Sequence, residues 1–286
     1  MNYSLEQEQQ QFCERFEGWL SHYLETQKQS PLVASKLLES QSYSLLSGGK
    51  RFRPFLSFLC FRLFSESVQK IRSLCLALEM VHTYSLIHDD LPCMDNDDFR
   101  RGKPTNHKVF SEDIALLAGD GLLTDVFYLL SSDELLSPPT RVAMIRSLSE
   151  RIGSAGMVSG QVLDMQATEK VTYADLQKIH RLKTAHLIQA SAVGGALAAD
   201  AKQEDVVAIY EFAFHLGMAF QIKDDLLDAT DKEQDFKSYL SVLGKEKTVT
   251  ALLDHSQQAQ QWIQKVSVGD KTALQALIEF NFNRKN

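Results

Sequence analysis

The chain has 286 residues, 44% of them hydrophobic, and a formal net charge of −7. These totals describe an ordinary globular protein with ample core, and the mild acidity, with no Lys/Arg-dense segment, excludes nucleic acid as a partner. The cysteines show no C-x-x-C spacing and no secretory signal is recognised, so we expect reduced thiols and a cytoplasmic location. No apolar run approaches the roughly eighteen residues that span a bilayer, so we expect no stable membrane insertion.

The predicted elements are helices throughout, because apolar residues recur at helical spacing in every long segment. Helices are predicted from Ser4 to before Pro31, over 33–46, from Pro54 onward, and over 67–91, 111–131, 140–167, 173–199, 203–230, 246–266 and 270–281. The helix over 67–91 is apolar on nearly every side, as a central helix would be. No period-2 strand, internal repeat or linker is recognised, so the sequence predicts one all-α domain covering residues 1–286.

A first acidic cluster lies where the helix over 67–91 ends. Asp89 and Asp95 would point away from each other on a regular helix. Because Pro92 disrupts the helix between them, Asp95 is free to return beside Asp89. Carboxylates on helix ends and loops suit Mg²⁺, which bridges one or two carboxylates to a substrate phosphate.

A second acidic cluster follows another apolar helical run. Asp224 and Asp228 share one face of a helix, and Asp225 flanks that face. Like charges four residues apart destabilise a helix, and a hard divalent cation with oxygen ligands would offset the repulsion. We expect the two clusters to face each other across a pocket.

Basic residues complete this pattern. Arg100-Arg101, the Lys50-Arg51-x-Arg53 stretch and Lys183 provide cations for anionic oxygens that the carboxylates alone would repel. Carboxylates, metal ions and basic walls together suit a diphosphate ligand.

Other interpretations compete with this one. A single D-D-x-x-D on a helix is usually a solvated acidic face. An EF-hand fails because Phe99 stands at its fifth position and no glycine follows. His82 and His88-Asp89 suggest the H…HD…D pattern of metal phosphohydrolases, which would have to use two histidines six apart on one helix.

Taken in order, the motifs resemble those of the trans-isoprenyl diphosphate synthases, specifically the bacterial farnesyl diphosphate synthases. The matching segments span about residues 45–250: Gly48 to Pro54, Tyr84 to Asp95 with Arg100-Arg101-Gly102, Gly160-Gln161-x-x-Asp164, Lys183-Thr184, and Phe220-Gln221-x-x-Asp224-Asp225-x-x-Asp228. The resemblance implies an isoprenoid-synthase bundle of helices around a central cavity, generally as a homodimer. It also implies condensation of isopentenyl diphosphate with dimethylallyl or geranyl diphosphate, using three Mg²⁺ ions, with Mn²⁺ as an alternative.

The resemblance assigns roles to individual residues. The principal metal ligands would be Asp89, Asp95 and Asp224, with Asp90, Asp225 and Asp228 direct or outer ligands. Arg100, Lys183, Thr184 and Gln221 would hold the allylic substrate, and Lys50, Arg53, His82 and Arg101 the diphosphate of isopentenyl diphosphate. Gly49 and Gln161 would belong to the substrate site, although Gln161 and Asp164 equally suit a polar contact between helices. His82 shares a helical face with Asp89, and a structural histidine with satisfied hydrogen bonds is an equal alternative for it.

Three features leave alternatives open. Tyr84 lies five residues before Asp89 and, with the smaller Ser85, resembles a cavity floor that stops growth of the prenyl chain at fifteen carbons. The alternative is that Tyr84 is a core aromatic. The alternative products have ten or twenty carbons. The segment after the second cluster, 231–237, lacks the family's glycines; Lys237 and Lys247 stand at suitable spacings, with Lys245 competing.

The basic C-terminal residues, 283–286, either close over the site or fray. A catalytically silent subunit is the alternative from another functional class, but both acidic clusters are intact.

Overall fold

The computed structural model describes residues 3–228 and 236–285. It divides into two compact units, each described here by itself. The first unit in the chain, called the N-terminal unit, comprises residues 6–55 and 69–141, and the C-terminal unit comprises residues 1–5, 56–68 and 142–286. The expected single domain over residues 1–286 stays a prediction.

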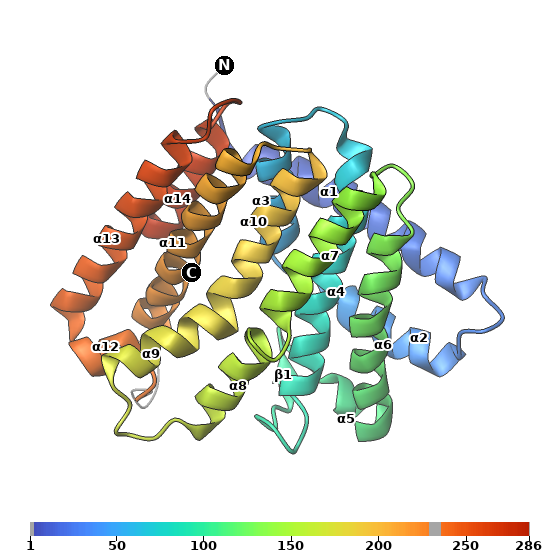
Figure 1. Ribbon diagram of the computed structural model, residues 1–286. Coiled ribbons are helices and arrows are strands. Elements are labelled where there is room, and N and C mark those ends of the chain that lie inside the picture. The colour runs from blue at the N-terminus through green and yellow to red at the C-terminus, as the bar shows by residue number, and fades with distance from the viewer. Residues whose placement is uncertain (1–2, 229–235, 286) are drawn as a thin grey trace. The chain divides into compact units, whose positions relative to one another are not determined.

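The N-terminal unit is built around α4, as its apolar composition predicts. Its elements are α1 (Leu5–Lys28), α2 (Ser35–Leu45), a 3₁₀ turn η1 (Val68–Ile71), α4 (Arg72–Asp89), α5 (Asn106–Phe110) and α6 (Glu112–Ser131). Helix α4 packs along α6 (Figure 1). Their close approach depends on Gly119, where an added Cβ would lie 2.1 Å from Nε2 of His88.

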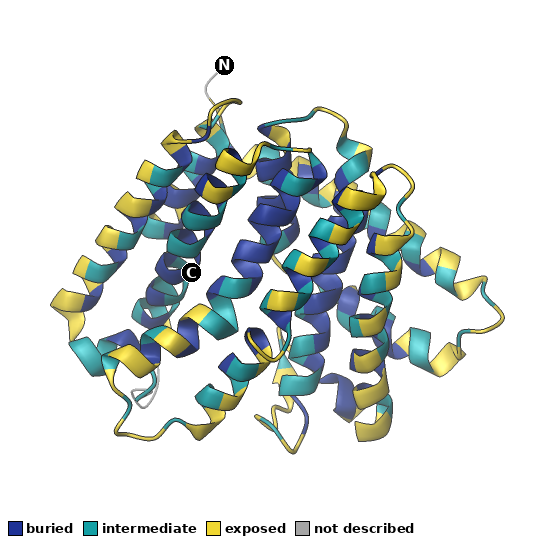
Figure 2. Cartoon of the chain, in the orientation of Figure 1, coloured by how far each residue is buried: buried dark blue, intermediate teal, exposed yellow. Residues whose placement is uncertain are grey.

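The C-terminal unit has α10 at its centre. Its helices include most of α3 (Phe52–Arg62) and α7 (Pro138–Ile152), then α8 (Met157–Gln166), α9 (Tyr173–His180), a π-helical turn η2 (Arg181–Ala185), α10 (His186–Ala198), α11 (Gln203–Asp228), α12 (Tyr239–Leu243), α13 (Lys245–Gln264) and α14 (Thr272–Asn283). Almost all of α10 is buried, whereas α13 keeps an exposed outer face (Figure 2). Helix α11, which carries the second acidic cluster, packs against both α10 and α13.

Most predicted helices are confirmed, and three predictions are wrong. The helix expected over 140–167 is two helices, because the chain turns between Gly153 and Gly156, where the Gly156 N–H donates to the Gly153 carbonyl. The short helices α5 and α12 were not predicted. Two strands of two residues each, β1 (Phe99–Arg100) and β2 (Lys103–Pro104), pair antiparallel in a segment expected to be a loop.

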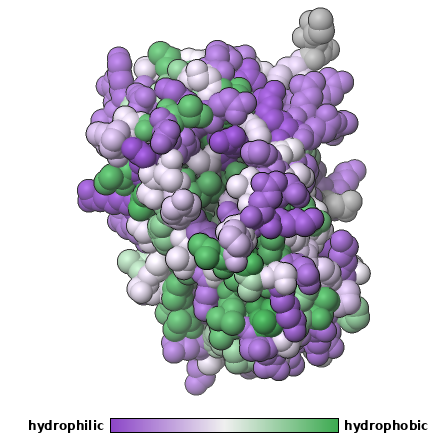
Figure 3. Space-filling model, turned by 90° about the vertical axis from the view of Figure 1, so that its right-hand side faces the viewer, coloured by the Kyte–Doolittle hydropathy of each residue, from purple (hydrophilic) through white to green (hydrophobic). Residues whose placement is uncertain are grey.

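Helix α6 corrects the expectation about apolar runs. Among the described residues it is the one helix that is long and apolar enough, by length and composition, to cross a membrane. Such a helix is weak support for insertion, because core helices pass the same test. Its exposed apolar residues include Leu116 and Leu117, and Figure 3 shows hydrophobic side chains gathered on this face of the molecule.

Candidate active site

The first acidic cluster closes back on itself as predicted. Asp89 is the last residue of α4, and the Asp95 N–H donates to the Asp89 carbonyl at 2.9 Å. The return of the chain uses a positive φ of 54° at Asn96, a residue that tolerates the left-handed region. The two predicted ligand residues are therefore neighbours in space at the end of a buried helix.

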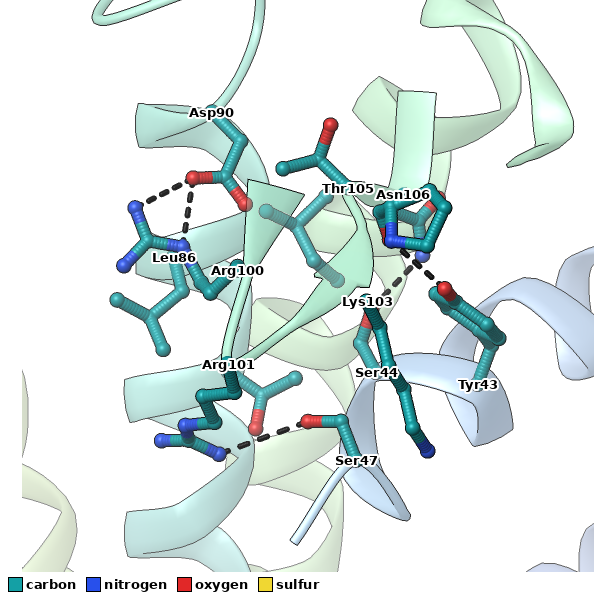
Figure 4. Close-up of a pocket in the computed structure, with 13 residues that line it drawn as sticks. Tyr43, Ser44, Ser47, Leu86, Asp90, Arg100, Arg101, Lys103, Thr105 and Asn106 are labelled. Carbon is teal, nitrogen blue, oxygen red and sulfur yellow. Dashed lines mark hydrogen bonds and ion pairs between the residues drawn. The ribbon is translucent and has the colours of Figure 1, made fainter. Parts of the chain in front are cut away.

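Asp90 has a different partner. It is buried, and its Oδ1 accepts a hydrogen bond from Nε of Arg100 at 2.6 Å and lies 2.5 Å from Nη2 of the same guanidinium. The β1–β2 hairpin delivers Arg100 to this position (Figure 4). This ion pair lets Asp90 hold the Arg100 guanidinium in place.

Arg101, on the same hairpin, points away from Asp90 and toward the turn at Ser47 (Figure 4). Its Nη1 donates to the Gly48 carbonyl and lies 3.5 Å from the Ser47 hydroxyl. At Gly49 φ is +133°, and an added Cβ would lie 2.8 Å from Nη1 of Arg101. The positive φ favours glycine at position 49, and the absence of a side chain there lets Arg101 approach the turn.

His82 lies in a strongly positive environment. Its pKa is held well below the usual value, first by burial and then by the charges of Arg53, Arg101 and other nearby arginines. Arg51 is a separate case: it is buried, and its guanidinium pairs with Glu17 at 2.8 Å and with Glu79 at 2.5 Å. Arg53 and Arg101 therefore make the surroundings of His82 positive, which suits an anionic ligand.

The backbone of Lys50 is held from α1, since Nε2 of Gln9 donates to the Lys50 carbonyl at 3.0 Å. The Lys50 residue itself is exposed. Lys50 therefore lies at the surface next to the Gly48-Gly49 turn.

Tyr84 is buried on α4, and burial raises the pKa of its hydroxyl to about 12. Its ring stacks edge-on against His88, with 5.8 Å between the ring centroids. His88 in turn lies 3.0 Å from the Leu116 carbonyl, so it joins α4 to α6 and does not suit the phosphohydrolase pattern. Ser85 donates to the His82 carbonyl within the helix.

The second acidic cluster is divided among three environments. Asp224 pairs with Arg284, whose Nη2 lies 2.6 Å from Oδ1. Asp225 is buried and accepts hydrogen bonds from Gln221 at 3.0 Å and from the backbone N–H of Tyr239 at 2.7 Å. Asp228 is exposed at the end of α11. Asp224 and Asp228 keep the shared helical face that the spacing predicts.

Asp164 brings two predicted lysines together. Its Oδ2 accepts from Lys183 Nζ at 2.6 Å, and its Oδ1 lies 3.3 Å from Lys237 Nζ. Burial would raise the pKa of Asp164, but the two lysines outweigh burial and lower it. Lys247 lies exposed on the first turn of α13, and no bond between it and Asp164 occurs within residues 3–228 and 236–285. The residues 231–235 of the predicted loop lie outside the described residues.

Gly160 allows α8 to pack closely against the turn η2, which carries Lys183. An added Cβ at Gly160 would lie 2.4 Å from the Lys183 nitrogen, so only glycine permits this contact. Lys183 and Thr184 belong to the π-helical turn η2, a feature frequent at functional sites. Thr184 donates to Gln221 at 2.9 Å, and the buried Nε2 of Gln161 has no hydrogen-bond partner within the described chain.

Two neighbours of the predicted site residues differ in how far the sequence indicated them. Arg284 belongs to the tail expected either to close over the site or to fray; it pairs with Asp224 and stacks over Phe220 with 4.3 Å between Cζ and the ring centroid. Tyr239 carried no signal, because its contact with Asp225 uses a backbone N–H. The basic residue Arg284 can be recognised in the sequence, whereas the contact between the Tyr239 N–H and Asp225 cannot.

The carboxylates present fit Mg²⁺. Asp89 and Asp95 stand together and offer hard oxygen donors, and so do Asp224 and Asp228 on one helical face. In the described chain, no three His, Cys, Asp or Glu side chains gather closely enough to hold a metal by themselves. Mg²⁺ suits such incomplete sites, because it keeps several waters and uses substrate phosphates as further ligands.

Known proteins resemble the whole chain. A farnesyl diphosphate synthase from Bacillus subtilis is 46% identical over 205 residues, covering 71% of this chain and 69% of its own. A chloroplastic geranylgeranyl pyrophosphate synthase from Catharanthus roseus is 45% identical over 203 residues, covering 70% of this chain and 57% of its own. The crystal structure of a geranyltransferase from Legionella pneumophila superimposes with a TM-score of 0.88 at 34% identity, covering 99% of this chain and 98% of its own.

The family comparison agrees with the motifs and with the geometry. Residues 34–277 match the polyprenyl synthetase family, and the solved relatives share the helical fold. The chain belongs to the polyprenyl synthetase family and has the all-α isoprenoid-synthase fold.

Proposed function

We propose that the protein is a farnesyl diphosphate synthase, which joins isopentenyl diphosphate to dimethylallyl and then to geranyl diphosphate. The observation that carries this proposal is the environment of His82. A neutral histidine surrounded by arginines, in the same unit as the Asp89–Asp95 pair, suits a diphosphate that comes with metal ions. The names of the relatives support the reaction, and the geranylgeranyl synthase among them makes a twenty-carbon product the nearest alternative.

Asp89, Asp95 and Asp224 would hold Mg²⁺, or Mn²⁺ in its place, as three ions when substrate is bound, with Asp228 as an outer ligand. When bound, these ions neutralise the charge that builds up on the departing diphosphate. The structure supports a different part for Asp90, which holds Arg100.

The cationic side chains divide between the two substrates. Lys183 and Lys237, kept together by Asp164, would bind the allylic diphosphate. Thr184, Gln221 and Arg100 would serve the same substrate, and Gln161 would belong to the substrate site. Lys50, Arg53, His82 and Arg101 would bind the diphosphate of isopentenyl diphosphate at the Gly49 turn. Fixed positive groups that need no reorganisation stabilise the leaving diphosphate.

The apolar part of the site would protect the allylic cation from water until the double bond of isopentenyl diphosphate attacks it. Tyr84 lies buried one and a half helical turns before Asp89, as a cavity floor would. The diphosphate that has left takes the proton, so no side chain is assigned as a base.

We also propose a cytoplasmic homodimer. Supporting this are the exposed apolar residues of α6, which a second copy would cover, and the four cysteines, none of which forms a disulfide. Size-exclusion chromatography with light scattering tests the dimer, since a monomer at micromolar concentration would contradict it.

The experiment that tests the site compares turnover of Asp89→Asn and Asp224→Asn with that of Asp98→Asn. Asp98 is the matched control, because it is exposed in the same loop as Asp95 and forms an ion pair with Lys108 at 2.7 Å. We expect each ligand variant to lose at least a hundredfold of kcat, on the order of 3 kcal/mol of transition-state stabilisation. Full activity in both ligand variants would refute the metal assignment.

A further inference from the structure

Asp225 differs from its neighbours in the second acidic cluster. Only 9% of the residue is exposed. Its Oδ1 accepts from Nε2 of Gln221 at 3.0 Å, and its Oδ2 accepts from the Tyr239 backbone N–H at 2.7 Å. Both oxygens thus already accept hydrogen bonds from the protein itself.

The bond to Tyr239 fastens the start of α12 to α11. Tyr239 is the first residue of α12, and its N–H is one of those that a helix cannot satisfy internally. Ser238 caps the same turn by accepting from the Ser241 N–H at 3.1 Å, and Thr248 donates to the Tyr239 carbonyl at 3.0 Å. The backbone around Tyr239 is therefore held from two helices, α11 and α13.

This anchored position sets the reach of Lys237. The two residues from Lys237 to Tyr239 extend about 7 Å at most, so the backbone of Lys237 follows that of Tyr239. From there its Nζ comes within 3.3 Å of Asp164, which also binds Lys183 at 2.6 Å. The ring of Tyr239 is also buried against Tyr173 and His180, so the bond from Asp225 fixes the direction of the backbone toward Lys237 and is not the sole anchor of Tyr239.

We propose that Asp225 is a positioning residue for the reaction, which holds the Tyr239 N–H and thereby keeps Lys237 beside Lys183 and Asp164. It does not bind metal directly. The consequence for turnover rests on the proposed function of the two lysines, whereas the hydrogen bond to Tyr239 does not.

The Asp225→Asn variant separates this role from a metal role. An asparagine oxygen still accepts from the Tyr239 N–H. Its NH₂ donates to Gln221 once the Gln221 amide reverses, and the Thr184 hydroxyl then accepts from Gln221, so the hydrogen-bonded chain survives. A metal ligand, in contrast, loses its charge in Asp225→Asn and in Asp225→Ala alike.

We expect kcat/KM of Asp225→Asn to stay within about threefold of wild type and that of Asp225→Ala to fall at least tenfold, mainly through KM. Titration with Mn²⁺, followed by electron paramagnetic resonance, should give the same affinity for Asp225→Asn as for wild type. The matched control Asp224→Asn makes the same change of charge one residue away and should bind Mn²⁺ more weakly. The proposal would be overturned if the Asp225→Asn variant were as impaired in turnover as Asp225→Ala and bound Mn²⁺ weakly.

Hydrogen exchange measures the bond itself. The Tyr239 amide, followed in peptides covering 236–243, should exchange slowly in wild type and Asp225→Asn and at least tenfold faster in Asp225→Ala. Unchanged protection in Asp225→Ala would also overturn the proposal. If Asp225→Ala fails to fold, the Mn²⁺ titration of Asp225→Asn decides between the two roles. Only a metal-binding role predicts that Asp225→Asn binds Mn²⁺ more weakly than wild type. Failure of the proposed function would instead appear as wild-type protein without turnover.

Discussion

The half-buried histidine pair between α11 and α13 predicts that the protein loses stability in mild acid. Nδ1 of His215 lies 3.0 Å from Nδ1 of His255, so one ring donates and the other accepts while both are neutral. Burial lowers the pKa of both side chains, and for His255 the pKa falls from 6.5 to about 4, with His215 adding to the shift. Protonation of the accepting ring removes the acceptor, and protonation of either ring places a charge in a half-buried site.

The sign of the effect follows from the lowered pKa. The unfolded chain takes up a proton at His255 near pH 6.5, and the native protein does so only near pH 4. The contribution to stability is therefore complete above pH 6.5 and is lost as the pH falls toward 4. The difference amounts to roughly 3 kcal/mol in total, of which about 2 kcal/mol is lost between pH 7.5 and pH 5.

Urea unfolding at pH 7.5 and at pH 5 measures this loss. The variant His255→Gln keeps a polar partner for His215 but does not titrate, so it should lose about 2 kcal/mol less than wild type between these pH values. His22→Gln removes an exposed histidine of α1 and serves as the control. Equal pH dependence in wild type and His255→Gln would refute the reasoning.

Three further changes have expected outcomes. Arg284→Gln frees Asp224 from its ion pair, so the affinity for Mn²⁺ should rise on the order of five- to tenfold. The control Lys285→Gln removes an exposed charge from the next residue and should leave the Mn²⁺ affinity unchanged. Equal effects of the two changes would contradict the assignment. Gly160→Ala places a Cβ 2.4 Å from a backbone nitrogen and should cost roughly 1–3 kcal/mol in urea unfolding, whereas Gly18→Ala meets no atom within 4 Å and should cost nothing. Tyr84→Ala removes the proposed floor and should lengthen the product beyond fifteen carbons, as chromatography of the dephosphorylated products would reveal; an unchanged product would make Tyr84 a core aromatic only.

Much of the fold was predictable because it depends on local pattern. The apolar periodicity of α4 and α11 located both helices, and Pro92 correctly indicated that Asp95 returns to Asp89. The break between α7 and α8 was missed, since a glycine inside a helical pattern does not by itself distinguish a turn from a tolerated residue. The β1–β2 hairpin was missed because strands of two residues show no periodicity.

The site was predictable in its residue types and less so in their partners. The motif that contains Asp164 was recognised, but the sequence did not decide between a polar contact of two helices and a part in the substrate site. In the structure Asp164 joins α8 to Lys183 and to Lys237. Spacing could not choose between Lys237 and Lys247, because that choice depends on where the chain returns after α11. The contact of Asp225 with Tyr239 lay beyond sequence reasoning, since any residue other than proline supplies that N–H.

One product assay tests the central claim most directly. Purified protein would receive labelled isopentenyl diphosphate with dimethylallyl or geranyl diphosphate, with Mg²⁺ or with a chelator, and the dephosphorylated products would be sized by chromatography. We predict farnesol from both allylic substrates, only when Mg²⁺ is present. No prenyl product from either substrate with Mg²⁺ would contradict the account and would favour a catalytically silent subunit.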